Sequence, residues 1–347
     1  MIKHLLKSAI TFALVVGCAR VHAQNQQVKI VQDPGQKKID VLIGGKPFTS
    51  FLYPDTLEKP VLYPVRTSNG ALVTRGFPFS MRKDEPTDHP HHLGIWFTFE
   101  NVNGLDFWNN SYAIPAEKKN QYGWIRTDKI TATKSGEKGM LSYHANWTNQ
   151  QKNILLEENT TYEFSGDAHQ RIIDRTTVLT ANTDVNFTDA KDGLYGIRVA
   201  HELQIPSVED KKYTDDKGNV TVVKGVKDSI ANGTYLTSEG KVGDSAWSTR
   251  AVWCKMYGQL ENDSVSVVMI DHPKNPNYPT YWHARGYGLF AANPLGEKIF
   301  TNGKAATNLH LTKGASVTFK YRIVIHDDSQ TLSAEKINRL AADFAKQ

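Results

Sequence analysis

Apolar and polar residues alternate along most of this chain with a period of two. The clearest runs are rich in β-branched residues and lie at 28–31, 38–43, 130–133, 160–164 and 264–270. Successive side chains of a strand point to opposite faces, so this period predicts strands with one buried face. Gly and Asn-Gly turn signals separate the runs at short intervals. The pattern therefore predicts an all-β fold, and the density of strands favours a β-sandwich.

The C-terminal part of the chain adds one more strand and then changes period. Residues 316–326 continue the alternation, whereas residues 329–346 open on Ser329 and carry one apolar stripe. That stripe consists of Leu332, Ile337, Leu340 and Phe344. A stripe of this spacing behind a serine predicts an amphipathic C-terminal helix. Residues 24–347 contain no linker-like break, so we expect a single domain, with the polar stretch 208–244 forming hairpins above the sandwich.

The N-terminus predicts export from the cytoplasm. A basic start precedes an apolar run at 8–17 that is too short to span a bilayer. Val21 and Ala23 then supply the small residues of a cleavage site. We therefore expect residues 1–23 to be a signal peptide and the mature protein to be periplasmic or secreted. The alternative is a lipobox ending at Cys18, which would make the protein a lipid-anchored lipoprotein.

Charge and cysteine content exclude several classes of protein. Lys3, Lys7 and Arg20 leave with the predicted signal peptide and no acid leaves with them, so the formal charge falls by three, from +5 to +2. No cluster of Lys and Arg remains that would attract nucleic acid. No later segment has the ~20 apolar residues of a transmembrane helix, and no protein partner is predicted. Only Cys254 remains in the mature chain, so we expect no internal disulfide and a buried, structural Cys254.

The most informative motif is an Asp-His-Pro tripeptide that occurs twice, at 88–90 and 271–273. Aromatic residues and further histidines follow both copies closely. Proline disfavours the helical conformation in the residue before it, so we expect each histidine to project from an extended segment. We also expect the two copies to meet in space as one composite site. Such a site has three interpretations: metal binding, proton transfer, or a structural contact between two loops.

A divalent metal is the first interpretation. Zn, Ni or Mn sites take two to four His, Asp or Glu ligands that converge in space. His89 and His91 are two apart and share one face of an extended segment, and His272 and His283 are available to close the site. The chain has no zincin motif. The sequence therefore leaves the presence of a metal cofactor open.

Acid–base catalysis on a carbohydrate is the second interpretation. Histidine transfers protons near neutral pH, and a neighbouring carboxylate fixes its tautomer. Sugar rings stack on Trp and Tyr, while Arg, Asn and Asp bind hydroxyl groups. The expected catalytic residues are His89, His92, His272, His283, Asp88 and Asp271. The expected substrate-binding residues are His91, Asp106, Trp108, Lys191, Arg198, Asn275, Trp282 and Arg285. Of these, Lys191 and Arg198 either clamp an anionic or keto-sugar substrate or form a solvated pair.

Longer motifs carry a resemblance to a known family. The segments 88–96 and 103–108, which read DHPHHLGIW and NGLDFW, resemble the signature of the PmoA-like family of secreted bacterial proteins. The likeness continues at 59–65, 189–193, 196–200, 271–276, 282–290 and 292–294, so it covers nearly the whole mature chain. One departure is Asp192, where the family usually has Glu.

This resemblance implies a β-supersandwich like that of galactose mutarotase, and a role among genes for carbohydrate use. It does not imply methane oxidation, because the monooxygenase subunit behind the family name consists of membrane helices, which this sequence lacks. We therefore expect a secreted lyase, hydrolase or epimerase that transfers a proton on a sugar or on an oxidised (keto) glycoside. The alternative is a non-catalytic glycan-binding protein, which needs aromatic and amide side chains but no convergent His/Asp group.

Overall fold

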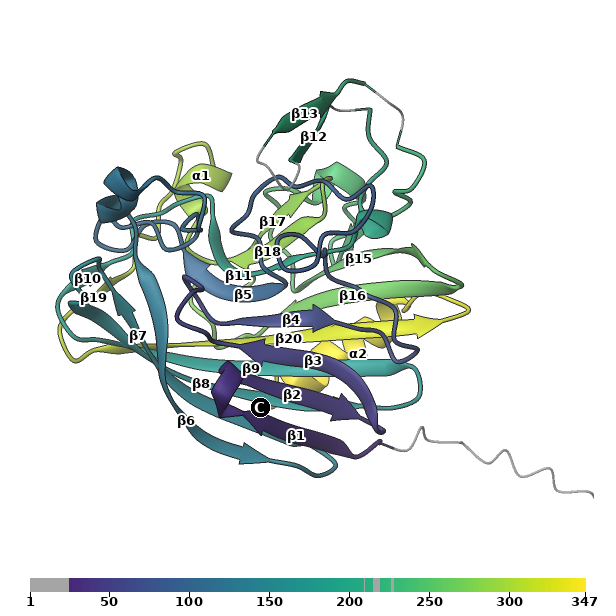
Figure 1. The fold of residues 1–347 in the computed structure, drawn as a ribbon, viewed down its shortest axis with the longest axis horizontal. Coiled ribbons are helices and arrows are strands. Elements are labelled where there is room, and N and C mark those ends of the chain that lie inside the picture. Colours follow the sequence, from purple (N-terminus) through teal and green to yellow (C-terminus); the bar gives the residue numbers. More distant parts are fainter. Residues whose placement is uncertain (1–24, 209, 215–218, 226–227) are drawn as a thin grey trace, which may run out of the picture.

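The computed structural model describes residues 25–208, 210–214, 219–225 and 228–347. These residues form two eight-stranded antiparallel sheets that pack face to face, with two small two-stranded sheets beside them (Figure 1). The predicted all-β class is thereby confirmed. The predicted signal peptide and Cys18 lie outside the described residues. No helix in the described part of the chain has the length and apolar character needed to cross a bilayer.

The elements have the following bounds. In spatial order, the first sheet contains β1 (Val28–Asp33), β2 (Lys38–Ile43), β3 (Lys46–Leu52), β4 (Val61–Val65), β5 (Ile95–Phe99), β11 (Gly193–Arg198), β18 (Leu289–Asn293) and β17 (Tyr281–Arg285). The second contains β14 (Thr234–Thr237), β15 (Trp253–Leu260), β16 (Asp263–Asp271), β20 (Ser316–Asp328), β9 (Gln170–Ala181), β8 (Ile154–Gly166), β7 (Gly139–Thr148) and β6 (Trp124–Lys134). The small sheets pair β10 (Val185–Asn186) with β19 (His310–Leu311), and β12 (Lys211–Thr214) with β13 (Val220–Val223). The α-helices are α1 (Glu297–Phe300) and α2 (Ala334–Phe344), and the 3-10 turns are η1 (Pro34–Gln36), η2 (Ala116–Gln121), η3 (His201–Leu203) and η4 (Gly243–Ala246).

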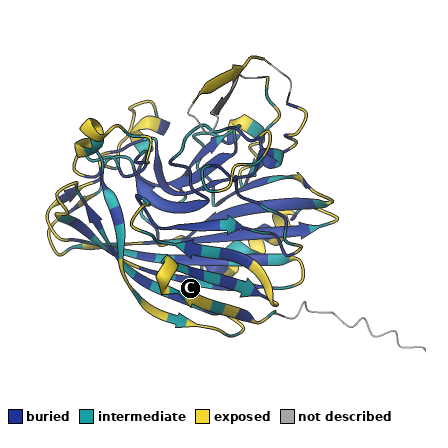
Figure 2. Cartoon of the chain, viewed as in Figure 1, coloured by how far each residue is buried: buried dark blue, intermediate teal, exposed yellow. Residues whose placement is uncertain are grey.

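Alternation along the strands builds the main core between the two sheets. In β2, Ile39, Val41 and Ile43 are buried in this core, while the residues between them are partly exposed. Figure 2 shows the buried positions concentrated in the two sheets. Burying apolar surface contributes roughly 25 cal/mol per Å², so this face-to-face packing is the main stabilising term of the fold.

Helix α2 covers the outer face of the second sheet. Its Ile337 and Phe344 pack against Val268 and Val324, which belong to β16 and β20 and point away from the main core. The helix was expected to begin at Ser329, but its N-cap is Ser333, whose side chain accepts a hydrogen bond from the amide of Lys336 at 3.3 Å. The predicted C-terminal helix is thus confirmed, with a start four residues later than the sequence suggested.

The structure also bears out two smaller predictions, a hairpin in the polar stretch and a buried cysteine. The polar stretch 208–244 contains the β12–β13 hairpin, which stands above β17 and β18 in Figure 1. Cys254 is fully buried in the main core, where burial raises the pKa of its thiol. It is therefore the structural cysteine that the sequence predicts.

Candidate functional site

Strands β11 and β17 of the first sheet present a second row of side chains on the face turned away from the main core. Along β17, Trp282 enters the main core, so His283 and Arg285 lie on the opposite face. Along β11, Ile197 enters the core and Arg198 faces outward. The period of two therefore brings basic and imidazole side chains together on this outer face.

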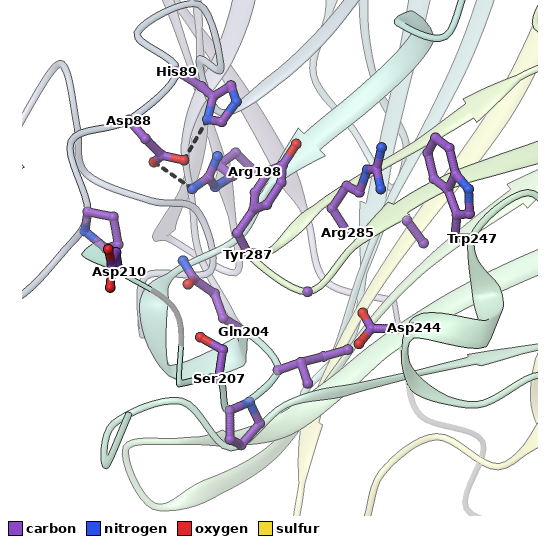
Figure 3. Close-up of a pocket in the computed structure, with 15 residues that line it drawn as sticks. Asp88, His89, Arg198, Gln204, Ser207, Asp210, Asp244, Trp247, Arg285 and Tyr287 are labelled. Atoms are coloured by element: carbon purple, nitrogen blue, oxygen red, sulfur yellow. Dashed lines mark hydrogen bonds and ion pairs between the residues drawn. The ribbon is translucent and has the colours of Figure 1, made fainter. Parts of the chain in front are cut away.

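A cavity of about 900 Å³ lies over this face (Figure 3). Its polar lining includes Asp88, His89, Arg198, Asp210, Asp244 and Arg285, and its aromatic walls are Trp247 and Tyr287. The volume lies within the range of small-molecule sites, which combine apolar walls with a few convergent polar groups. The cavity is therefore the candidate functional site.

Asp88 is the charge centre at one end of the cavity. Its Oδ1 accepts hydrogen bonds from Nη1 of Arg75 at 2.6 Å and from Nη2 of Arg198 at 2.8 Å. Burial alone raises the pKa of a carboxyl, but Arg198, His89 and Arg75 together hold the pKa of Asp88 far below its usual range. Arg75 also donates to the main-chain carbonyls of Asp88 and His89. Asp88 is thus ionised and fixed in position.

His89 lies against Asp88, with Nδ1 2.5 Å from Oδ2 of the carboxylate. An ionised carboxylate only accepts, so Nδ1 carries the proton and Nε2 is the free acceptor of the ring. Within the described residues Nε2 has no hydrogen-bond partner. The expected extended backbone is wrong here: φ is +46°, because the segment folds into a turn in which the amide of His92 donates to the carbonyl of His89 at 3.0 Å.

His92 and His91 support this pair from beneath. Nδ1 of His92 accepts from Nη1 of Arg198 at 3.0 Å, and its ring stacks on Trp96. Burial, followed by nearby positive groups, keeps the pKa of both histidines well below the ordinary value, so both are neutral. Both terminal nitrogens of Arg198 are bound to protein groups. His92 and Arg198 therefore hold Asp88 in position, while the catalytic role expected of His92 and the substrate-binding role expected of Arg198 stay predictions.

Arg285 occupies the other end of the cavity. Its Cζ lies 3.6 Å from the ring centroid of Trp247, and its Nε lies 3.4 Å from Nε2 of His283. Arginine only donates, so a neutral His283 carries its proton on Nδ1, which lies 3.3 Å from Oδ1 of Asp192. Burial holds the pKa of His283 well below the ordinary value. His283 is only 1% exposed and supports Arg285 from below. The catalytic role expected of it stays a prediction.

Asp192, the position at which the sequence departs from the PmoA-like pattern, contacts His283 beneath the cavity. Burial raises the pKa of its carboxyl to about 6, against the opposing effect of Lys191. The Nζ of Lys191 lies 3.5 Å from Asp192, and the lysine side chain is 44% exposed. Lys191 therefore contacts Asp192 and does not line the cavity, contrary to its predicted substrate-binding role.

Sequence reasoning missed Trp247 and Tyr287. The ring of Tyr287 stacks on that of His89, with centroids 5.1 Å apart, and lies 4.6 Å from the guanidinium carbon of Arg198. Burial raises the pKa of Tyr287 to about 12, so its hydroxyl remains a proton donor. Tyr287 continues the every-second-residue row of His283 and Arg285, and that spacing was the available signal. Trp247 has no local signal, because tertiary contacts with Arg285 and His283 bring it to the site.

The second Asp-His-Pro copy does not join the site. Asp271 ends β16 in the second sheet and accepts a hydrogen bond from Nδ2 of Asn275 at 2.7 Å. His272 is fully buried and packs edge-on against Phe344 of α2, with ring centroids 4.9 Å apart. Neither residue lines the cavity or contacts His89 within the described residues. The expectation that the two copies meet in one composite site is therefore wrong: the first copy lies in the loop before β5 of the first sheet, whereas the second begins at the end of β16 in the second sheet. The catalytic roles expected of Asp271 and His272 stay predictions.

Four further residues of the predicted binding set lie outside the cavity wall. Asn275 also binds the main chain of β20 through both atoms of its amide group. Trp282 is fully buried between the sheets, where its Nε1 donates to a main-chain carbonyl at 2.9 Å. Asp106 accepts two hydrogen bonds from Asn109, and Trp108 is fully buried in the layer beneath the cavity. All four side chains therefore have structural contacts in the protein, and their expected substrate contacts stay predictions.

The metal interpretation gains no support from the geometry. Across the described ranges, no group of three or more His, Cys, Asp and Glu side chains is arranged to hold a metal ion. In the first Asp-His-Pro copy, Nδ1 of His89 faces Asp88, whereas Nδ1 of His92 faces Arg198. The two ring nitrogens, which would have to face one metal ion, therefore form hydrogen bonds to different protein groups.

Comparisons with solved structures find distant similarity to carbohydrate-related proteins. A GH36 α-galactosidase from Geobacillus stearothermophilus is 10% identical, with a TM-score of 0.38, over 87% of this chain and 41% of the enzyme. The chain thus spans about two fifths of the length of that relative. A galactose mutarotase-like protein from Clostridium acetobutylicum is 10% identical, with a TM-score of 0.35, over 88% of this chain and 99% of that protein. At TM-scores this low, neither similarity carries an argument about function.

Sequence comparison is more specific. No curated protein matches the chain. One family matches over residues 38–342, a range that holds both sheets apart from β1 and includes every cavity residue named above. The match covers far more than half of the sequence. The chain therefore belongs to DUF6807, a family of unknown function.

Proposed function

We propose that this protein is a carbohydrate-active enzyme in which Asp88 and His89 form the proton-transfer pair. The observation that carries the proposal is the 2.5 Å contact between Oδ2 of Asp88 and Nδ1 of His89 at the cavity wall. This contact leaves Nε2 of His89 as the acceptor for a proton from a ligand or from a water molecule next to it. Asp88 then stabilises the imidazolium that forms, since its own charge is held by two arginines.

Tyr287 supplies the complementary donor. Its ring lies against that of His89, and its high pKa keeps the hydroxyl protonated at neutral pH. A base and a proton donor side by side are what elimination, epimerisation and hydrolysis of a glycoside have in common. The proposal covers these three reactions on a sugar or on an oxidised (keto) glycoside.

The walls of the cavity support a sugar as ligand. Trp247 and Tyr287 offer aromatic surface, while Gln204, Asp210 and Asp244 offer groups that bind hydroxyls. The sequence resemblance to the PmoA-like family, with its setting among carbohydrate genes, agrees with this choice and itself stays a prediction. A glycan-binding protein uses similar walls, but it has no need of a carboxylate-oriented histidine.

The test is turnover by a His89→Asn variant on a panel of neutral, acidic and keto-glycosides. Asn tolerates the positive φ at this position, so the fold is expected to persist. Loss of a general base typically lowers the rate by ~10²–10⁴-fold, and we expect a fall of that size. His310→Asn is the matched control, because His310 is exposed on β19, away from the cavity.

Two outcomes would overturn the proposal. One is a folded His89→Asn variant with wild-type turnover. The other is wild-type protein that binds glycans from the panel and converts none of them, which would favour the non-catalytic alternative.

A further inference from the structure

Arg285 is a cation without an acceptor at the cavity wall. Apart from the long contact of Nε with His283, its guanidinium forms no hydrogen bond or ion pair with any described residue. Arg198 at the same cavity is bound to Asp88. A guanidinium presents its donors in a planar fork that matches a carboxylate or an ester sulfate. The Nη1 and Nη2 atoms of Arg285 are therefore free to bind a ligand.

The guanidinium of Arg285 is also held in place. The indole of Trp247 stacks against it at 3.6 Å, and Trp247 is itself packed edge-on against Phe300. From below, His283 accepts from Nε and turns its own proton toward Asp192. A side chain fixed in this way loses little conformational entropy when it binds an anion, so affinity is gained without new contacts.

The charges at the two ends of the cavity differ in their availability. Asp88 is matched by Arg75 and Arg198, so its charge is compensated within the protein. Figure 3 shows Tyr287 between this group and Arg285. Among the described residues that line the cavity, Arg285 is therefore the cation without an ion pair.

Two carboxylates also line the cavity, and they favour the sugar part of the ligand. Asp244 and Asp210 form no ion pair with Arg285 within the described residues, and Oδ1 of Asp210 accepts from the amide of Gly225 at 3.0 Å. Carboxylates accept hydrogen bonds from hydroxyl groups, whereas a guanidinium needs an acceptor. A ligand with several hydroxyls and one anionic group satisfies both kinds of side chain.

We infer that the substrate is an acidic sugar and that its carboxylate or sulfate binds Arg285. The inference rests on the proposed function, which supplies the sugar substrate, and it adds that this sugar carries a negative charge. It moves the anion-binding role from Lys191 and Arg198, to which the sequence assigned it, to Arg285.

The test measures binding separately from turnover. Affinities of methyl glucuronide, glucose 6-sulfate and methyl glucoside are measured by calorimetry or by NMR titration, with His89→Asn in every protein to suppress turnover. Arg285→Met keeps the stem against Trp247 and removes the charge. A charge-assisted hydrogen-bond pair corresponds to about 10–100-fold in affinity, and we expect a loss of this size for one or both acidic sugars. The neutral glucoside is expected to change little.

Two further variants sharpen the test. Arg285→Lys keeps the charge without the planar fork, so its affinity for the acidic sugar is expected to fall between those of the parent and Arg285→Met. Arg339→Met, on the exposed surface of α2, is the matched control and is expected to bind as the parent does.

The outcomes separate this inference from the proposed function. Equal affinity for acidic and neutral sugars, or equal weakening of both by Arg285→Met, overturns the inference. Acidic sugars that bind through Arg285 but are never turned over by the wild type leave the inference standing and end the proposed enzyme. Turnover of neutral sugars alone, abolished by His89→Asn, would leave the proposed function standing and overturn the inference about acidic sugars.

Discussion

Carboxyl groups within one small region differ widely in acidity because their neighbours differ. Two guanidinium groups keep Asp88 ionised, whereas burial raises the pKa of Asp192 to about 6. Pairs of groups whose pKa values are pushed apart are characteristic of sites that move protons. Asp88 is therefore a fixed negative charge beside His89. Asp192, which lies beneath Arg285, changes its charge around pH 6.

Asp192 gives a pH-dependent prediction at the residue scale. Its folded pKa of about 6 lies above the ordinary 3.8, so its contribution to stability is complete below pH 3.8 and is lost as the pH rises through 6. The full effect corresponds to ~3 kcal/mol. In Asp192→Asn this term is absent, so we expect its free energy of unfolding to fall less than that of the wild type over this pH window. Denaturant unfolding at a series of pH values measures the difference.

Asp128→Asn is the control for this experiment, because the side chain of Asp128 is 54% exposed. We expect its pH profile to follow that of the wild type. If Asp192→Asn also followed the wild type, a raised pKa at Asp192 would be ruled out.

At the residue scale, sequence motifs located one end of the cavity well. The Asp-His-Pro-His-His segment supplies Asp88 and His89, and local spacing was enough because these residues contact each other. The second copy led to the wrong prediction of a composite site, since a tripeptide does not reveal next to which sheet it lies. Trp282 and His283 are adjacent in sequence, yet the pleat sends one into the core and the other toward the site.

At the element scale, the sequence predicted strands such as β2 and β16 and did not single out β5 and β11. Strand β2 has the expected bounds of 38–43 and a strict alternation of burial. In β5 and β11 every residue is buried, because the main core covers one face and the layer beneath the cavity covers the other. Such strands lack the period-two signal. They are also the strands that support the site, which explains why the architecture was easier to predict than the cavity.

Helix α2 gives a prediction for the second Asp-His-Pro copy. His272 packs against Phe344, and its Nδ1 accepts from the amide of Lys274 at 3.1 Å. Its pKa is lowered to about 4, chiefly by burial, so it is a neutral packing residue at neutral pH. We expect His272→Ala to lower the free energy of unfolding by about 1–3 kcal/mol and to leave turnover and sugar affinity unchanged.

Thermal or denaturant unfolding together with the glycoside assays checks this expectation, and His310→Ala serves as the exposed control. Loss of turnover in a His272→Ala protein of unchanged stability would instead restore the catalytic role that the sequence suggested.

At the scale of the whole molecule, a buried ion pair within the second sheet reaches the first sheet through the guanidinium of its arginine. Glu158 of β8 accepts from Nη2 of Arg175 at 2.7 Å, and the guanidinium of Arg175 lies 4.4 Å from the ring centroid of Phe97 in the opposite sheet. Tyr143 and Trp147 complete the shell around the carboxylate. The interaction therefore helps to fix the relative placement of the second sheet and the strand that carries Trp96.

Breaking this pair from one side is expected to be costly. Glu158→Gln leaves Arg175 charged and buried, so we expect a loss of about 3–5 kcal/mol in the free energy of unfolding. The double variant Glu158→Leu with Arg175→Met removes both charges and is expected to recover much of that loss. Denaturant unfolding of the three proteins is the measurement. A single variant as stable as the wild type would show that the pair does not hold the sheets together.

The cavity and α2 lie on the outer faces of different sheets, with the main core between them. This separation makes the molecule two-sided. A solid support, a fluorescent dye or a fused carrier attached beside α2 stands away from the cavity mouth. Immobilisation through that side therefore orients every molecule with its cavity toward the solution, which is the geometry that surface-based screening of glycan libraries requires.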